Sequence, residues 1–233
     1  MSKSTAVAAT NTIGSQEVAN IEERSSRVGQ GSQNVTQRDI MIPRLKLLQK
    51  ISPEVDKSDA KFVEGAEVGM IMNSVSNEFM DATFVVNLNF DHSIVVWKKR
   101  KFGGGMFGSY ANESEAIAAL EAAHEVVEQY DIAENPTHLV MLLDGEGNPK
   151  GIALLDMPGT KAKISRKWNT LIQEQEDKGN PRFGCIWELS STSEDSPNGT
   201  YANYSIDLVV VAGDEIFDAA SAAYDNFFGP KDV

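Results

Sequence analysis

The sequence predicts an α+β, β-rich fold in which an antiparallel barrel or sheet carries inserted helices. About eight short β-type segments are separated by turn residues, and the helical segments fall between them without regular alternation. The last segment has the spacing of an amphipathic helix. A chain of 233 residues with 41% hydrophobic residues suits one domain with a sizeable core and a tail.

Residues 1–38 are rich in Ser, Thr, Ala, Asn, Gln and Gly and contain no aromatic residue. Such a segment buries too little apolar surface to offset chain entropy. We therefore expect a disordered N-terminal arm over 1–38, a domain over 39–212, and a C-terminal acidic helix and tail over 213–233.

The first half of the domain reads as a series of strands. Charged and apolar residues alternate in 40–49, and 62–71 resembles a loop that runs into a short strand. The segments 83–90 and 93–97 are rich in β-branched and aromatic residues. We expect the last two to form a hairpin through Asn89-Phe90-Asp91-His92.

The second half mixes helices with hairpins. Residues 113–130 are Ala-rich with apolar residues at helical spacing, and 137–143 and 151–155 predict a hairpin. A second helix is expected from Thr160, its predicted N-cap, to the acidic run at 174–177.

The chain closes with two further strands and a helix. The strands are expected at 183–190 and 200–211, with Asn198-Gly199 as a strong turn signal. Apolar residues at helical spacing over 214–228 then predict an amphipathic closing helix with a short free end.

The formal net charge is −13 and the isoelectric point is near 4.7, which argues against nucleic-acid binding when the charge is averaged over the chain. The distribution is uneven, however. Residues 111–160 and 207–233 carry most of the excess acids, whereas 41–110 are close to neutral. A local basic site in that central region is therefore compatible with the overall charge.

A basic island follows the strand at 93–97. It combines cations with aromatic residues and a Gly-rich loop: Trp97, Lys98, Lys99, Arg100, Lys101, Phe102, Phe107 and Tyr110. A groove for single-stranded nucleic acid needs cations along the backbone path and aromatic faces on which bases stack. The alternative is a solvated strand end whose lysines prevent edge aggregation and whose Trp97 points into the core.

A second basic cluster lies on the predicted helix that begins at Thr160. It consists of Lys161, Lys163, Arg166, Lys167 and Trp168. Cations at a helix N-terminus oppose the helix dipole, which hints at a bound anion. Trp168 lies on the apolar stripe of this helix, so packing in the core is its alternative role.

No motif for catalysis, cofactor binding or metal binding is visible. The glycines at 103–108 do not match a phosphate-binding loop, the three histidines lack ligand spacing, and no nucleophile elbow occurs. The single Cys185 lies in an apolar phrase and is expected to be buried. We expect no enzyme activity and no cofactor.

Four phrases of the sequence belong together by order and content. They are Ile42-Pro43-Arg44-Leu45-Lys46-Leu47-Leu48-Gln49 with Ser52-Pro53-Glu54-Val55, Val95-Val96-Trp97-Lys98 before a glycine-rich turn, Lys161-Ala162-Lys163 leading to Lys167-Trp168-Asn169, and Asn198-Gly199-Thr200-Tyr201-Ala202-Asn203. In this order and content the chain resembles tailed-bacteriophage early proteins that look like single-stranded DNA-binding proteins of the OB-fold type. The resemblance spans about residues 40–228. It implies a five-stranded OB-like barrel with insertions and a role in phage replication or recombination.

The expected function is therefore binding of single-stranded DNA with little sequence preference, in the host cytoplasm. The expected contacts are Arg44, Lys46 and both basic clusters. No membrane segment is apparent, and homo-oligomerisation is left open. Replication proteins of the phage or host are further candidate partners through the C-terminal segment, although Phe227-Phe228 lies in a predicted helix rather than at an acidic tail tip. The alternative is an acidic interaction protein that mimics nucleic acid or inhibits a host factor through its helix at 113–130.

Overall fold

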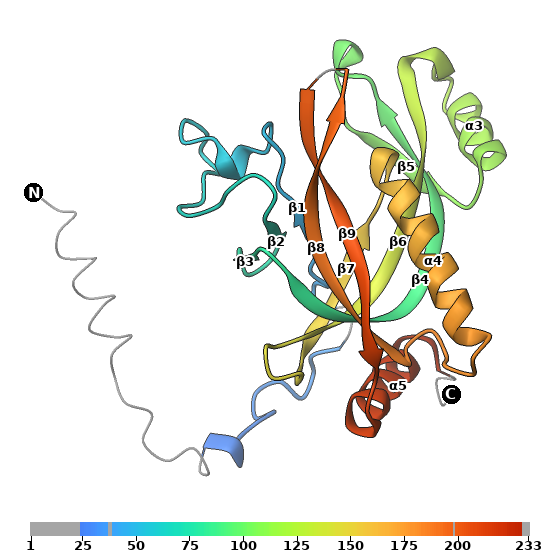
Figure 1. The fold of residues 1–233 in the computed structure, drawn as a ribbon. Helices are drawn as coiled ribbons and strands as arrows, with labels where there is room; N and C mark the ends of the chain where they lie inside the picture. Colours follow the sequence, from blue (N-terminus) through green and yellow to red (C-terminus); the bar gives the residue numbers. More distant parts are fainter. Residues whose placement is uncertain (1–23, 37–38, 198, 230–233) are drawn as a thin grey trace, which may run out of the picture. The chain divides into compact units, whose positions relative to one another are not determined.

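The computed structural model describes residues 24–36, 39–197 and 199–229. The chain divides into two compact units, Met1–Met41 and Ile42–Val233. The labelled helices and strands of Figure 1 belong to the second unit. In the first unit, residues 26–31 form turns. Most of the arm expected at 1–38, and the free end at 230–233, lie outside the described residues.

The main sheet is antiparallel and contains six strands. They are β4 (Thr83–Lys98), β5 (Met106–Tyr110), β6 (Tyr130–Leu143), β7 (Pro149–Asp156), β8 (Cys185–Ser196) and β9 (Gly199–Val211). Their order is β7-β6-β4-β8-β9, and β5 pairs with the far half of β4. A small second sheet is formed by β1 (Leu45–Leu47), β2 (Ile71–Asn73) and β3 (Phe79–Met80).

The two sheets curl toward a barrel that backbone pairing does not close (Figure 1). At the β7 edge, the Leu154 amide donates to the Pro43 carbonyl at 2.8 Å, just before β1. At the β9 edge a side chain crosses the gap instead: the Gln49 amide donates to the Ala202 carbonyl at 2.9 Å and accepts from the Ala202 amide at 3.2 Å. The α+β, strand-rich class is confirmed, but the barrel that the resemblance implied is open.

The inner core fills the concave side of this curved sheet. Its members include Leu47, Val140, Leu155 and Trp187, all essentially without solvent exposure. Helix α4 (Ala162–Glu176) lies against it and contributes Trp168 and Ile172. Cys185 is also part of this core, as the apolar sequence around it predicted.

The outer face of the sheet is partly covered by helix α5 (Asp214–Phe228), which confirms the predicted closing helix. Strand alternation separates the two faces: Val140 and Leu142 of β6 face the inner core, whereas Leu139, Met141 and Leu143 belong to a second apolar cluster. Ala220 and Phe227 of α5 pack in that second cluster.

The predicted strands at 83–90 and 93–97 are in fact one strand, β4. The polar segment between them pairs with β6 throughout, so Asn89-Phe90-Asp91-His92 forms no hairpin turn. A bulge lies instead between Asn87 and Asn89, where the register to β6 shifts by one residue. The predicted turn is therefore wrong: the strand continues through these residues, and a bulge shifts its register without ending it.

The predicted helix at 113–130 is also shorter than expected. Helix α3 (Glu113–Ala122) begins at Asn112, whose side chain accepts a hydrogen bond from the Glu115 amide at 2.9 Å. It ends at Ala122, and two residues later His124 adopts a left-handed conformation with φ of 56°. Val127 then lies in a turn of 3-10 helix, Val127–Gln129, and Tyr130 at the start of β6 joins Leu120 of α3 in a third small core.

Two further boundaries differ from expectation. A single turn of 3-10 helix, Gly159–Lys161, precedes α4, and Thr160 therefore makes no N-cap hydrogen bond. The strand expected at 40–49 is limited to β1. The predicted hairpin of β8 and β9 is found, but β8 continues to Ser196, beyond the predicted end at 190. Residue 198, in its predicted turn, is not described.

Candidate functional site: a groove on the outer sheet face

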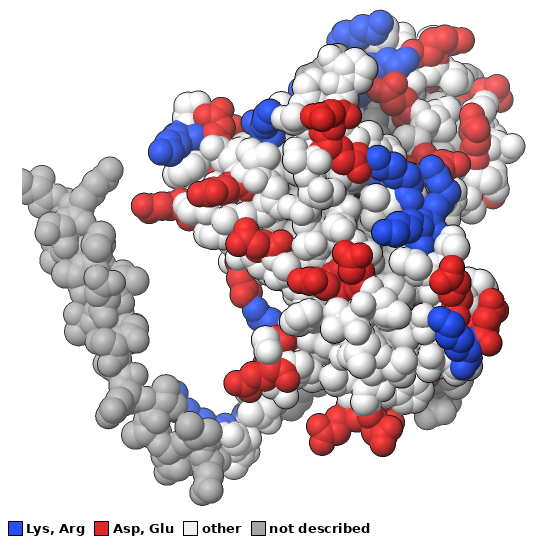
Figure 2. Space-filling model, viewed as in Figure 1, with Lys and Arg blue, Asp and Glu red and all other residues white. Residues whose placement is uncertain are grey.

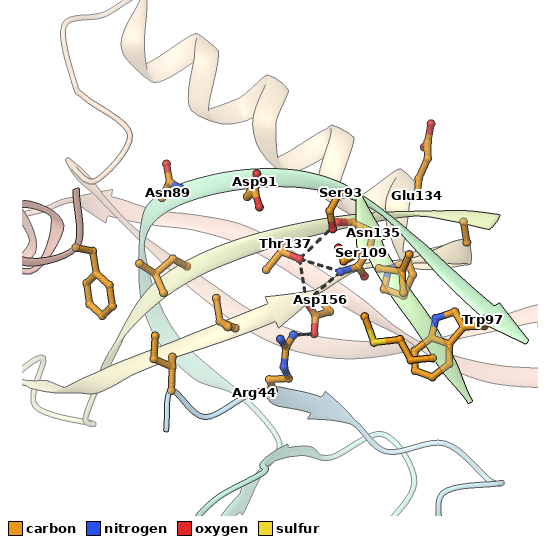
Figure 3. A pocket seen from close by; sticks show the side chains of 18 of the residues that line it. Arg44, Asn89, Asp91, Ser93, Trp97, Ser109, Glu134, Asn135, Thr137 and Asp156 are labelled. Carbon is orange, nitrogen blue, oxygen red and sulfur yellow. Dashed lines mark hydrogen bonds and ion pairs between the residues drawn. The ribbon is translucent and has the colours of Figure 1, made fainter. Parts of the chain in front are cut away.

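A groove of about 910 Å³ lies on the outer face of β4, β6 and β7 (Figure 3). Arg44 lies on one side of it, and Trp97 and Met106 lie on another. Phe227 and Phe228 of α5 also line it. It is therefore an uncovered part of the sheet face next to the one that α5 covers.

Strand alternation explains which side chains reach the groove. Beyond the β4 bulge, every second residue faces outward, which places Asp91, Ser93 and Trp97 on the floor or wall. On β6 the same rule selects Asn135 and Thr137.

The floor is held by a polar network at its centre (Figure 3). The Thr137 hydroxyl donates to Asp156 Oδ1 at 2.8 Å, and Asn135 Nδ2 donates to Thr137 Oγ1 at 3.1 Å. The other oxygen of Asp156 pairs with the guanidinium of Arg44. The carboxylate of Asp156 is thereby paired, and the floor presents amide and hydroxyl groups.

The groove itself is close to neutral. Arg44 and Asp156 compensate each other, and Asp91 is the remaining floor acid. Glu134 lies at the border, but its carboxylate is 3.9 Å from His92 Nε2, and Figure 3 shows it pointing away from the floor. The groove therefore differs in charge from the strongly acidic protein around it.

Exposed apolar side chains flank this polar floor. Trp97 is 48% exposed, Met106 is 54% exposed and Phe228 is 47% exposed. An indole at a groove wall offers a flat face for stacking, and a thioether adapts to the shape of a ligand. The alternative role for Trp97, pointing into the core, is wrong.

Two of the four cations of the island are neutralised by acids from the α3 side. Lys98 Nζ is 3.1 Å from Glu125, and the hydrogen bonds that Lys98 donates to Tyr130 and Glu125 raise the pKa of Lys98. Lys99 donates to the Glu128 carbonyl at 2.8 Å and lies 3.8 Å from Asp131. Through these contacts, the two lysines connect the end of β4 to the segment before β6 and to the start of β6.

The other two cations are available at the tip between β4 and β5. Within the described chain, no acid lies within ion-pair distance of Arg100 or Lys101, and both are exposed. Lys101 Nζ lies 4.9 Å from the ring centre of Phe102, which is itself 41% exposed. The tip therefore carries two cations and an aromatic ring without an acid partner.

The remaining aromatics of the island have a structural role. Phe107 packs edge-on against Tyr130 with ring centres 5.4 Å apart, and Tyr110 joins the same small core beneath α3. The structure thus separates the predicted aromatic set into Trp97 and Phe102, which are exposed, and two rings that hold α3.

The second basic cluster lies on the other face of the sheet. His138 of β6 contacts Ser165 of α4, whereas its neighbours Thr137 and Leu139 line the groove. The cations of α4 therefore do not form an opposite wall for Trp97. Figure 2 shows basic side chains gathered over α4 and, separately, over the β4–β5 tip.

Within this second cluster the predicted residues have different roles. Lys163 pairs with Glu194 at 2.6 Å, and this contact together with Tyr201 lowers the pKa of Glu194 to about 2. Lys161 lies over the ring of Tyr204 at 5.4 Å, and burial lowers the pKa of Lys161. Arg166 and Lys167 are exposed.

Trp168 must be removed from the predicted contacts, because it is 0% exposed and packs against Trp187 with ring centres 6.1 Å apart. Its apolar helical stripe indicated this role. Arg44 and Lys46, the other two cations predicted to contact DNA, both form ion pairs within the protein. Arg44 pairs with Asp156, and Lys46 pairs with Glu54 at 2.6 Å.

Sequence reasoning missed a buried polar network beneath the groove. His138 Nδ1 lies 2.9 Å from Asn87 Nδ2, and His138 Nε2 lies 2.9 Å from Ser165 Oγ. Arg182 donates to Asn87 Oδ1 at 3.2 Å. Four separate polar residues, none in a motif, meet here because strands and α4 bring them together.

This network resembles a Ser-His-Asn arrangement but is wrongly polarised for nucleophilic catalysis. An arginine can only donate, so the Asn87 oxygen faces Arg182 and the Asn87 amide donates to His138 Nδ1. The proton of His138 then lies on Nε2 and is donated to Ser165, whose hydroxyl is not activated as it is in a triad. Ser165 is also 1% exposed.

A family model for Pam3 phage gp34-like proteins matches residues 9–231, almost the whole chain. The chain belongs to this phage protein family. The phage origin that the resemblance implied is therefore confirmed for this gp34-like protein. No curated protein and no solved structure matches it. Among the described helices, none is long and apolar enough to cross a membrane.

Proposed function

We propose that this gp34-like phage protein binds single-stranded DNA with little sequence preference, with bases at the groove and phosphates at the β4–β5 tip. The observation that carries the proposal is the exposed indole of Trp97, between a near-neutral polar floor and the unpaired cations Arg100 and Lys101. Stacking supplies affinity that does not depend on base identity.

The charge arrangement favours this orientation of the strand. Phosphates are repelled by Asp91 on the floor and attracted to Arg100 and Lys101, so the backbone of a bound strand follows the rim. Unpaired bases then face the Asn and Thr side chains of the floor, whose amide and hydroxyl groups bond to base edges of either polarity. In a duplex the bases are paired and cannot stack on Trp97, so a duplex would interact only with the cations Arg100 and Lys101 at the tip.

The test uses tryptophan fluorescence and an electrophoretic shift with a thymidine oligonucleotide and a duplex of equal length, at two salt concentrations. Trp168 and Trp187 are 0% exposed, so quenching reports on Trp97. Single strands should bind more tightly than duplex, with a log-log salt slope of about −0.7 per phosphate neutralised.

Two variants locate the site. Trp97→Ala should weaken binding by about 1 to 3 kcal/mol, the usual value of one stacked base. Arg100→Ala with Lys101→Ala should weaken binding and flatten the salt slope. The matched control is Lys57→Ala with Lys61→Ala, which removes two exposed cations elsewhere. Equal losses in the control, or no salt-sensitive binding by the unmodified protein, contradict the proposal.

A second candidate is an acidic interaction protein. It is favoured by the acidic side chains that Figure 2 shows over much of the visible face and by the neutralisation of Lys98 and Lys99. This function predicts that the Arg100 and Lys101 double variant retains full activity in phage growth. Charge reversal at Glu113 and Glu121 on α3, both exposed, should then abolish it.

A further inference from the structure

The lower half of β9 is an exposed apolar edge strand. Leu208 is 42% exposed, Val209 is 49% exposed, Val210 is 53% exposed and Val211 is 48% exposed. The end of β9, which Figure 1 shows just before α5, falls in a part of the surface in Figure 2 without Lys, Arg, Asp or Glu side chains. Isolated exposed apolar residues are common, but a contiguous run on one strand marks an interaction site or an aggregation hazard.

The backbone of this segment is as open as its side chains. β9 is the last strand of the main sheet, and in the described chain residues 205–211 pair with β8 alone. The usual protections of an edge are sparse: the segment has no Lys and no Pro, and Asp207 is its one charge. A bulge opposite Ile186 and Trp187 is the remaining irregularity.

We propose that two copies of this chain associate by antiparallel pairing of their β9 edges about a two-fold axis. An antiparallel strand pair is self-complementary, because the same edge on each copy supplies donors and acceptors in reciprocal order. The pairing extends the main sheet of one protomer into that of its partner.

Electrostatics favours a second copy at this edge. Each protein carries a net charge of −13, so two copies repel wherever acidic surfaces meet. The stretch Leu208–Val211 has no charged residue, which makes it a contact at which identical acidic molecules can approach. In such a pair, the residue at the two-fold axis lies opposite its own copy in the partner. If that residue is 208, 209 or 210, the two Asp207 carboxylates do not lie opposite each other, which avoids repulsion between them.

The size of the contact sets its expected strength. One strand edge and four side chains bury less than the roughly 1,200 Å² of a standard stable interface. We therefore expect a reversible dimer whose population rises with protein concentration. The pairing rests on β9 and not on the groove, so it can fail or hold independently of DNA binding.

The first test is sedimentation velocity over a range of protein concentrations. Val210→Lys should raise the dimer dissociation constant at least about tenfold, because it brings a charge onto each paired edge. Val75→Lys is the matched control, since Val75 is 52% exposed and lies in the turn before β3. Circular dichroism checks that both variants fold.

The second test is cysteine scanning at positions 207 to 211 under oxidising conditions. The native Cys185 is 1% exposed, so it should not cross-link. A residue at the two-fold axis faces its own copy, and a cysteine there should form a symmetric disulfide, whereas Val75→Cys should not. A protein that stays monomeric, a dimer unchanged by Val210→Lys, an equal loss in Val75→Lys, or no self-cross-link at 207 to 211 overturns the proposal.

Discussion

His138 is a residue whose protonation the fold changes strongly. It is 0% exposed, between the rings of Phe90 and Trp168 at 4.9 and 4.6 Å. Burial, with Arg182 as a smaller cause, lowers the pKa of His138 from 6.5 to about 3. The folded protein therefore holds a neutral imidazole, and its charged form is disfavoured by desolvation.

This burial predicts a loss of stability in mild acid. Since the pKa of His138 is lower in the folded than in the unfolded chain, its contribution is complete above pH 6.5 and decreases as the pH falls toward 3. The free energy of unfolding should fall by up to about 1.4 kcal/mol per pH unit in this range. Urea unfolding at pH values between 7 and 5 measures the slope.

A control separates this effect from other titrations. Carboxylates with a lowered pKa, such as Glu194, lose their contribution only below their unfolded value of 4.5. The exposed His92 can be replaced by Gln as a matched variant, and the slope between pH 7 and 5 should persist. A His138→Gln variant with the same slope would contradict the assignment.

At the scale of single elements, sequence reasoning located α5, α4 and the β8–β9 hairpin, because two have apolar residues at helical spacing and the third has a strong Asn-Gly turn signal between β-type segments. Sequence reasoning failed where tertiary pairing overrides the local pattern. The segment Asn89-Phe90-Asp91-His92 in β4 suggested a turn, and the Ala-rich segment after Asn112 concealed the end of α3 at Ala122. Both depend on pairing with β6, which no local pattern encodes.

The candidate site was likewise predictable only in part. Trp97, Arg100, Lys101 and Phe102 were found from composition, since cations beside aromatics form a local pattern. The polar floor was missed because Asn135, Thr137 and Asp156 come from two strands and become neighbours only through register. Acid partners such as Glu125 were invisible for the same reason.

The N-terminus of α3 offers a test at this scale. Replacing Asn112 by Ala removes the hydrogen bond to the Glu115 amide and should lower the free energy of unfolding by about 1 kcal/mol. Chemical denaturation measures it. Asn112→Asp is the matched control and should retain most of the stability, because Asp also caps helices. Equal losses in both variants would argue against a capping role.

For the whole molecule, the barrel gap between β1 and β9 is the weak place. The Gln49 side chain makes both hydrogen bonds across it to Ala202, and the Tyr204 hydroxyl donates to the Leu45 carbonyl at 3.2 Å. The curved sheet is therefore held closed here by side chains and not by a ladder.

Gln49→Ala should lower the free energy of unfolding by about 1 to 3 kcal/mol, because it leaves buried backbone groups of Ala202 without partners. Hydrogen exchange should accelerate at residues 202–204 before the rest of β9. Lys57→Ala, in the loop that follows and exposed, is the control and should change little. Unchanged exchange in Gln49→Ala would mean that the gap is held elsewhere.

The bulge of β4 has a consequence for how this surface can change. Before it, odd-numbered residues such as Val85 point inward; after it, odd-numbered residues such as Trp97 point outward. Leu88 is the extra residue of the bulge, since Asn87 lies opposite Val140 and Asn89 lies opposite Leu139. Deleting Leu88 would therefore restore a regular ladder and leave Trp97 facing outward, whereas deleting a residue in the regular part of the strand, such as Ser93, would exchange the faces of Trp97 and Val96. The loss of one residue is thus mild at the bulge and drastic in the half of β4 that carries the groove.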